Sequence, residues 1–80
     1  MLSNIRRWEY MEYTVILHSA EEGGYWAEVP ALPGCFSQGE TVEETLSNIK
    51  AAIESHLIAI KAEGRSIPKD QIMVFSHVEI

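Results

Sequence analysis

Residues 25–53 read YWAEVPALPGCFSQGETVEETLSNIKAAI, and most of the predicted fold follows from this segment. Residues 25–29 are rich in aromatic and β-branched side chains and predict a strand. Pro30 ends that strand, because proline has no N–H to donate to a ladder. Pro33-Gly34 predicts a tight turn, since proline presets φ and glycine tolerates a positive φ. A further short strand is predicted to begin at residues 35–37.

A helix is predicted over residues 42–62. Thr41 and Glu44 fit a capping box, in which the threonine hydroxyl accepts from the N–H three residues on and Glu44 reaches back to the Thr41 N–H. Apolar residues then recur every three or four positions, as in one stripe of an amphipathic helix. The members of this stripe are Val42, Leu46, Ile49, Ile53, Leu57 and Ile60. We expect the stripe to dominate burial against a sheet.

Three segments outside this stretch complete the predicted order. Residues 12–18 predict a first strand, and the Glu-Glu-Gly-Gly run at 21–24 predicts a hairpin turn. Residues 72–80 predict a last strand, which could lie beside the first and parallel to it through a right-handed crossover. The fold class is therefore α+β, a two-layer β-β-β-α-β domain with one long helix on a mostly antiparallel sheet.

Residues 11–80 are expected to form a single domain. Residues 1–10 lack periodicity and are interpreted as an N-terminal extension, and translation from Met1 or from Met11 stays open. The chain has 80 residues, a size at which one core contributes only about 3–5 kcal/mol. Since Cys35 is the only cysteine, no intrachain disulfide can add to this, and self-association is the expected support.

Composition excludes several classes of protein. The net charge is -6, which disfavours binding to a phosphate backbone as the main activity. Apolar runs fall far short of the roughly 20 residues that span a bilayer. No apolar segment follows Arg6 and Arg7, so a signal peptide is not expected and the default location is cytoplasmic.

Catalytic chemistry has little support in the sequence. Cys35 could pair with one of three histidines (His18, His56 and His77), but no lysine or arginine lies near it to lower its pKa, and a buried structural cysteine is the favoured interpretation. The histidines lack metal-ligand spacing. Asp70 is the only aspartate, so no set of carboxylates suits a two-metal nuclease. We expect no enzymatic activity, no metal and no cofactor.

Residues 25–35, followed by Gln38-Gly39-Glu40-Thr41 and Val42-Glu43-Glu44, resemble the signature of the HicB family of antitoxins, and the likeness covers residues 11 to about 60. The resemblance implies a partly RNase H-like domain without that enzyme's catalytic acids. It also implies inhibition of a small, basic, mRNA-cleaving HicA-type toxin, and homo-oligomers such as dimers or tetramers. Many members continue into a DNA-binding domain. This chain stops at Ile80, so neither such a domain nor direct DNA binding is expected.

The resulting hypothesis is a non-enzymatic module that masks the RNA-binding and active surface of a toxin. Trp26 is predicted to lie on the sheet face that the helix leaves partly wet, where an exposed aromatic favours an interface. The candidate contacts are Tyr25, Trp26, Glu28, Pro33 and Phe36, with Glu43 and Glu54 as electrostatic contacts. One alternative is a solitary oligomeric structural or regulatory protein without a toxin. Another is a cryptic enzyme that uses Cys35 or the histidines.

Overall fold

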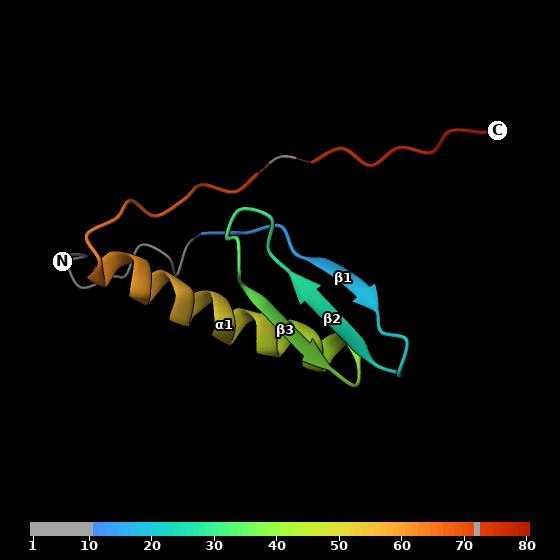
Figure 1. Ribbon diagram of the computed structural model, residues 1–80, viewed down its shortest axis with the longest axis horizontal. Helices are drawn as coiled ribbons and strands as arrows, with labels where there is room; N and C mark the ends of the chain where they lie inside the picture. Colours follow the sequence, from blue (N-terminus) through green and yellow to red (C-terminus); the bar gives the residue numbers. More distant parts are fainter. Residues whose placement is uncertain (1–10, 72) are drawn as a thin grey trace.

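Three antiparallel strands and one helix form two layers in this computed structural model, which describes residues 11–71 and 73–80. The sheet has the order β1-β2-β3, with β1 at Ile16–Ser19, β2 at Tyr25–Glu28 and β3 at Phe36–Gly39. The helix α1, Val42–Ala62, covers one face and packs mainly on β3 and β2 (Figure 1). The α+β class is confirmed. The extension predicted at residues 1–10 lies outside the described residues, and the likeness to RNase H stays a prediction.

Both hairpins pair without a slip in register. Ile16 lies opposite Glu28 and His18 opposite Trp26, while Trp26 and Glu28 lie opposite Gln38 and Phe36 of β3. The first strand was predicted from residue 12, but its ladder begins only at Ile16. The cause lies in the partner strand, because β2 ends before Pro30 and proline has no N–H to donate to a ladder. The residues before Ile16 therefore have no strand beside them to pair with.

At the start of α1, one of the two hydrogen bonds of the predicted capping box is formed. The Thr41 hydroxyl accepts from the Glu44 N–H at 3.0 Å, which satisfies one of the free N–H groups of the first turn. The Glu44 carboxylate, however, accepts from the N–H of Glu40 and not from that of Thr41. The predicted helix bounds are confirmed.

The predicted apolar stripe is wrong in the first helical turns. Val42 is 36% and Leu46 41% exposed, whereas Thr45 is 0% exposed. A close approach of α1 to β3 explains the shift, because a Cβ on Gly39 would lie 2.8 Å from the Thr45 N and 2.8 Å from its Oγ1. Thr45 tolerates burial because its hydroxyl donates to the Thr41 carbonyl at 2.7 Å. Leu46 is therefore left beside the sheet.

The core lies between α1 and the helix-facing side of the sheet. Its buried members are Ala27, Val29, Leu32, Cys35, Ile49, Leu57 and Ile60. Burial raises the pKa of the Cys35 thiol, which keeps it protonated at neutral pH and makes it a poor nucleophile. The interpretation of Cys35 as a buried residue is confirmed.

The predicted fourth strand is not formed by residues 73–80, and Ile72 lies outside the described residues. After α1 the chain turns back past the residues that precede β1, then runs on beyond the sheet to the C terminus (Figure 1). The turning segment is anchored, because the Tyr13 hydroxyl donates to the Pro68 carbonyl and the Asp70 carboxylate accepts from the Thr14 N–H and hydroxyl. Beyond this anchor the segment lacks the neighbouring strand that a ladder needs.

Candidate partner-binding face

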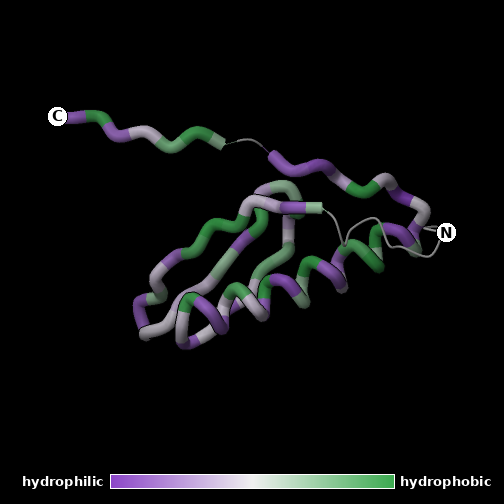
Figure 2. The backbone as a smooth tube through the Cα atoms, turned by 180° about the vertical axis from the view of Figure 1, so that it is seen from behind, coloured by the Kyte–Doolittle hydropathy of each residue, from purple (hydrophilic) through white to green (hydrophobic). Residues whose placement is uncertain are grey.

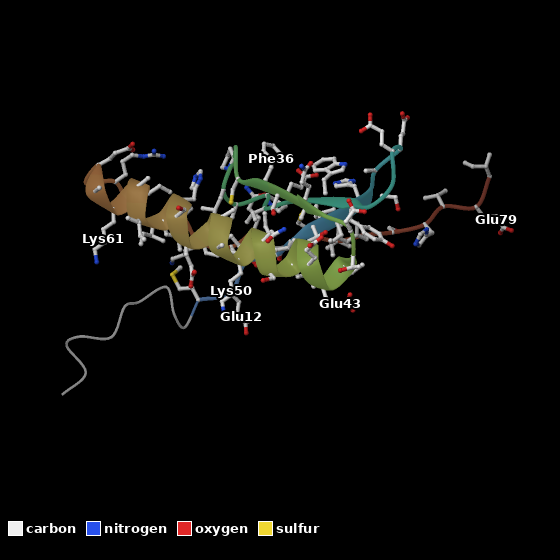
Figure 3. The ribbon with its side chains drawn as sticks, turned by 90° about the horizontal axis from the view of Figure 1, so that it is seen from below. Glu12, Phe36, Glu43, Lys50, Lys61 and Glu79 are labelled. Carbon is white, nitrogen blue, oxygen red and sulfur yellow. The ribbon has the colours of Figure 1, made fainter. Side chains whose placement is uncertain are left out.

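One face of the sheet carries an aromatic surface that α1 does not cover. Side chains alternate along each strand, and opposite residues of antiparallel strands share a face. The register therefore puts six residues together on the side away from the helix, and we call them the outer aromatic face: Ile16, His18, Trp26, Glu28, Phe36 and Gln38. Figure 3 shows Phe36 on this side, with Glu43 and Lys50 on the helix side.

Three rings form the centre of the outer aromatic face. The His18 imidazole stacks on the Trp26 indole with centroids 4.0 Å apart and planes 13° from parallel. Phe36 lies on the other side of Trp26 at 6.1 Å, within the range of favourable aromatic pairs. Glu28 fixes the imidazole through a 2.6 Å contact between its Oε2 and the His18 Nε2. Phe36 is 58% exposed, so the cluster offers a preorganised apolar surface to a partner.

An acidic pocket adjoins one end of the outer aromatic face. Its volume is about 630 Å³, and Trp26 and Tyr25 form part of its wall. Its lining includes three carboxylates, Glu22 from the β1–β2 turn, Glu40 from the connection before α1 and Glu44 from the first turn of α1. No lysine or arginine stands among the described residues that line it. The pocket is thus suited to a cationic side chain of a partner.

The structure brings together four of the predicted contact residues. Trp26, Glu28 and Phe36 share the outer aromatic face. Pro33 is exposed in the turn after β2 and lines a hollow with Glu28 and Phe36. That turn is closed by two hydrogen bonds, from the Leu32 N–H to the Val29 carbonyl at 2.9 Å and from the Cys35 N–H to the Leu32 carbonyl at 3.0 Å. Its rigidity holds Pro33 beside the face.

The other three predicted contacts lie elsewhere. Tyr25 points to the helix side of the sheet and reaches the site only through the wall of the acidic pocket. Glu43 lies in the first turn of α1, away from Phe36 (Figure 3). Glu54 lies further along the helix and lines a groove on the helix side. Only their charge predicts these two glutamates as contacts, and charge carries no information about which layer they face.

Sequence reasoning missed His18, Ile16 and the carboxylates of the acidic pocket as parts of the site. The signal for the first two was present, because a tight hairpin turn at residues 21–24 places β1 and β2 side by side and alternation gives the face. The sequence suggests His18 only as a partner of Cys35 or as a metal ligand, not as part of a binding face. Within residues 11–71 and 73–80, no group of three or more His, Cys, Asp or Glu side chains is placed to hold a metal ion.

Comparison with known proteins decides the family. The family described as "HicB_like antitoxin of bacterial toxin-antitoxin system" matches residues 13–77, most of the chain. This chain belongs to the HicB-like antitoxin family. The match includes both strands that carry Trp26 and Phe36, and it confirms the resemblance found in residues 25–44.

Three curated relatives are similar to this chain over most of their own length. A UPF0150 protein of Thermoplasma acidophilum is 50% identical over 60 residues, covering 75% of this chain and 87% of the relative. A UPF0150 protein of Synechocystis is 45% identical over 62 residues, covering 78% of each chain. A UPF0150 protein of Helicobacter pylori is 43% identical over 60 residues, covering 75% of this chain and 83% of the relative.

Membership of the HicB-like antitoxin family supports an antitoxin role, with a toxin as partner and a regulatory function that needs no catalysis. The geometry agrees with a binding role, since the most distinctive surface is a set of stacked rings beside an acidic pocket. None of the helices in the described part of the chain has the length and apolar content to cross a membrane.

Proposed function

We propose that this HicB-like chain neutralises a small, basic, mRNA-cleaving toxin of the HicA type by binding over its RNA-binding and active surface. The observation that carries the proposal is the outer aromatic face, which combines stacked rings with an uncovered sheet surface. Aromatic anchors of this kind are enriched at the centres of protein interfaces. Since the target of such a toxin is mRNA, a cytoplasmic location is part of the proposal.

Electrostatics supports a basic partner. A protein that binds RNA presents positive charge to the phosphates, and this chain has a net charge of -6. Opposite potentials speed association and steer the two surfaces into register. The acidic pocket then offers Glu22, Glu40 and Glu44 to a lysine or arginine of the toxin. The same cation would lie near the Trp26 ring, where a cation–π contact adds about 0.5–2 kcal/mol.

The role of Trp26 can be tested by truncation. We expect Trp26→Ala to weaken toxin binding by about 2 kcal/mol or more, roughly thirtyfold, as for a central aromatic anchor. Folding should be affected less, because Trp26 is only partly buried and faces away from the core. Calorimetric titration into a small basic toxin of the HicA type, with a thermal melt of each variant, measures both effects.

Ile58→Ala is the matched control for Trp26→Ala. Ile58 is 52% exposed on α1, in the layer opposite the outer aromatic face, and its truncation should leave toxin affinity unchanged. A Trp26→Ala chain that binds the toxin as tightly as the native chain would contradict the proposed contact surface. The toxin hypothesis would be contradicted if the reading frame beside this chain's gene encoded no small basic protein and no such protein co-purified with the chain.

A second candidate function is a self-assembling regulatory protein without a toxin. The exposed apolar side chains of residues 73–80 favour it, since Val74, Phe75 and Val78 are 88%, 70% and 79% exposed. This candidate differs from the first in having no toxin partner. The toxin titration separates them, because a solitary oligomer would give no heat with the basic toxin.

A further inference from the structure

The last residues of the chain are apolar and exposed but belong to no sheet, while the β1 edge of the sheet has no neighbouring strand among the described residues. We call residues 73–80 the C-terminal arm. Its residues read MVFSHVEI and contain one formal charge, on Glu79. The side chains of the arm are exposed and it joins no ladder in the described chain. Figure 2 shows apolar stretches along the arm, well clear of the sheet. Exposed apolar segments of this size mark interaction sites.

The alternation of the C-terminal arm matches the two faces of the sheet. In an extended chain one side would carry Val74, Ser76, Val78 and Ile80, which suit a buried face. The other side would carry Met73, Phe75, His77 and Glu79. That mixture of an aromatic, a histidine and a glutamate repeats the composition of the outer aromatic face, with its Phe36, His18 and Glu28. The arm therefore has the pattern of one more strand of this sheet.

An apolar groove lies where the buried side of such a strand would pack. It has a volume of about 460 Å³ and runs between α1 and residues 11–15, which lead into β1. Its apolar walls are Tyr13, Val15, Leu46, Ile49, Ile53 and Leu57. Leu46 is 41% exposed because α1 packs mainly on β3 and β2 and not beneath the β1 edge. A strand added at that edge would cover the groove.

The edge of β1 is free to receive this strand. In the sheet order β1-β2-β3, β1 has a neighbour on one side only within the described residues. An unpaired edge presents a row of N–H and C=O groups that pairs readily with a further extended segment. The groove and the edge are thus continuous parts of one acceptor surface.

The anchor that precedes the arm directs it away from its own sheet. Tyr13 and Thr14 hold Pro68 and Asp70 beside the entry to β1, and the chain then leaves along the long axis of the molecule (Figure 1). A chain that presents both a donor strand and a matching acceptor edge can close a two-fold dimer by reciprocal exchange. An 80-residue chain with a small core gains most from such a partner.

We propose that the C-terminal arm of one chain adds as a fourth strand to the β1 edge of a second copy and fills its apolar groove, in a reciprocal two-fold dimer. This inference does not depend on the proposed toxin, because the interaction forms between copies of the isolated chain. It assigns Val74, Val78 and Ile80 to the groove of the partner copy and leaves the outer aromatic face of each copy open.

Size and contact measurements on the full chain test the exchange. Light scattering should give twice the chain mass for the native protein and for the control Ile58→Asp. The double variant Val74→Asp, Val78→Asp should give the monomer mass while keeping the helical circular dichroism signal of α1. Isotope-filtered NMR on a mixture of labelled and unlabelled native chains should show contacts between arm methyl groups and those of Leu46 and Ile53 across chains.

Several results would overturn the exchange. They are a monomeric native chain, a dimer that survives the double variant, a dimer lost in Ile58→Asp but kept in the double variant, and arm contacts found only within one chain. The last outcome would mean that the arm folds back on its own β1 edge. Because the filtered NMR experiment uses the native sequence, it decides the question even if the double variant fails to fold.

Discussion

Asp70 is the residue whose contacts most clearly link distant parts of the chain. Its carboxylate accepts from the Thr14 N–H at 2.8 Å and from the Thr14 hydroxyl at 2.8 Å. These hydrogen bonds hold the pKa of the Asp70 carboxyl below its usual range, since they stabilise the charged form. The pair closes the chain after α1 onto the entry to β1, which positions the start of the C-terminal arm.

A pH dependence follows from this contact. A carboxyl whose pKa is lower in the folded chain than in the unfolded chain adds stability above its ordinary value of 3.8, and that stability is lost as the pH falls through the folded pKa. We expect Asp70→Asn to lower the melting temperature at neutral pH. The variant should also lose less stability than the native chain on acidification. Thermal melts from neutral pH to below the ordinary value measure this.

Glu21→Gln in the exposed β1–β2 turn is the control for Asp70→Asn. It removes a carboxyl whose surroundings include no such pair of donors, and its melting temperature should follow the native acid profile. Parallel acid profiles for the native chain and Asp70→Asn would show that the contact with Thr14 has no effect on the folding equilibrium.

Gly39 sets the distance between two elements, β3 and α1. A Cβ at this position would lie 2.8 Å from the Thr45 N and 2.8 Å from its Oγ1, so backbone would have to move. We expect Gly39→Ala to lower the free energy of unfolding by about 1–3 kcal/mol, as other overpacking changes do. Urea denaturation at neutral pH measures the loss.

The neighbour of Gly39 gives the matched control. Gln38 is exposed on β3, and Gln38→Ala should change the free energy of unfolding by no more than about 0.5 kcal/mol. Equal stabilities for Gly39→Ala and Gln38→Ala would mean that α1 does not approach β3 as closely as the structure places it.

Elements specified by neighbouring residues were predictable from the sequence. The cap at Thr41 and the stripe that follows fixed the bounds of α1, because capping and periodicity act over a few residues. The turn glycines likewise fixed the β1–β2 hairpin, with Gly23 and Gly24 at φ 102° and 77°. The burial of Thr45 in place of Leu46 was not predictable, since it depends on the contact with Gly39 across the two layers.

In the candidate site too, features that depend on neighbouring residues were predictable and features that depend on tertiary contacts were not. The side of the sheet that Trp26 occupies followed from alternation, but the set of residues gathered there depends on strand register, which brings His18 opposite Trp26. Glu43 and Glu54 were predicted from charge alone, and the structure places them in the helical layer. The extended pattern of residues 73–80 does not specify which sheet edge could receive them, so the absence of a fourth strand was not predictable from their sequence.

Across the whole molecule, the two proposals use two separate surfaces. The outer aromatic face and the acidic pocket suit a basic toxin. The C-terminal arm, the β1 edge and the groove suit a second copy. Because the sheet lies between the groove and the outer aromatic face, the proposed dimer would leave the outer aromatic face of each copy open.

An mRNA-cleavage assay shows whether the outer aromatic face covers the active surface of a ribonuclease toxin, as we propose. A small basic toxin of the HicA type is titrated with the native chain and with the double variant Trp26→Ala, Phe36→Ala. We expect the native chain to suppress cleavage at equimolar amounts and the folded double variant to leave cleavage unchanged. Cleavage that persists with the native chain, or suppression by the double variant equal to that by the native chain, would contradict the proposal.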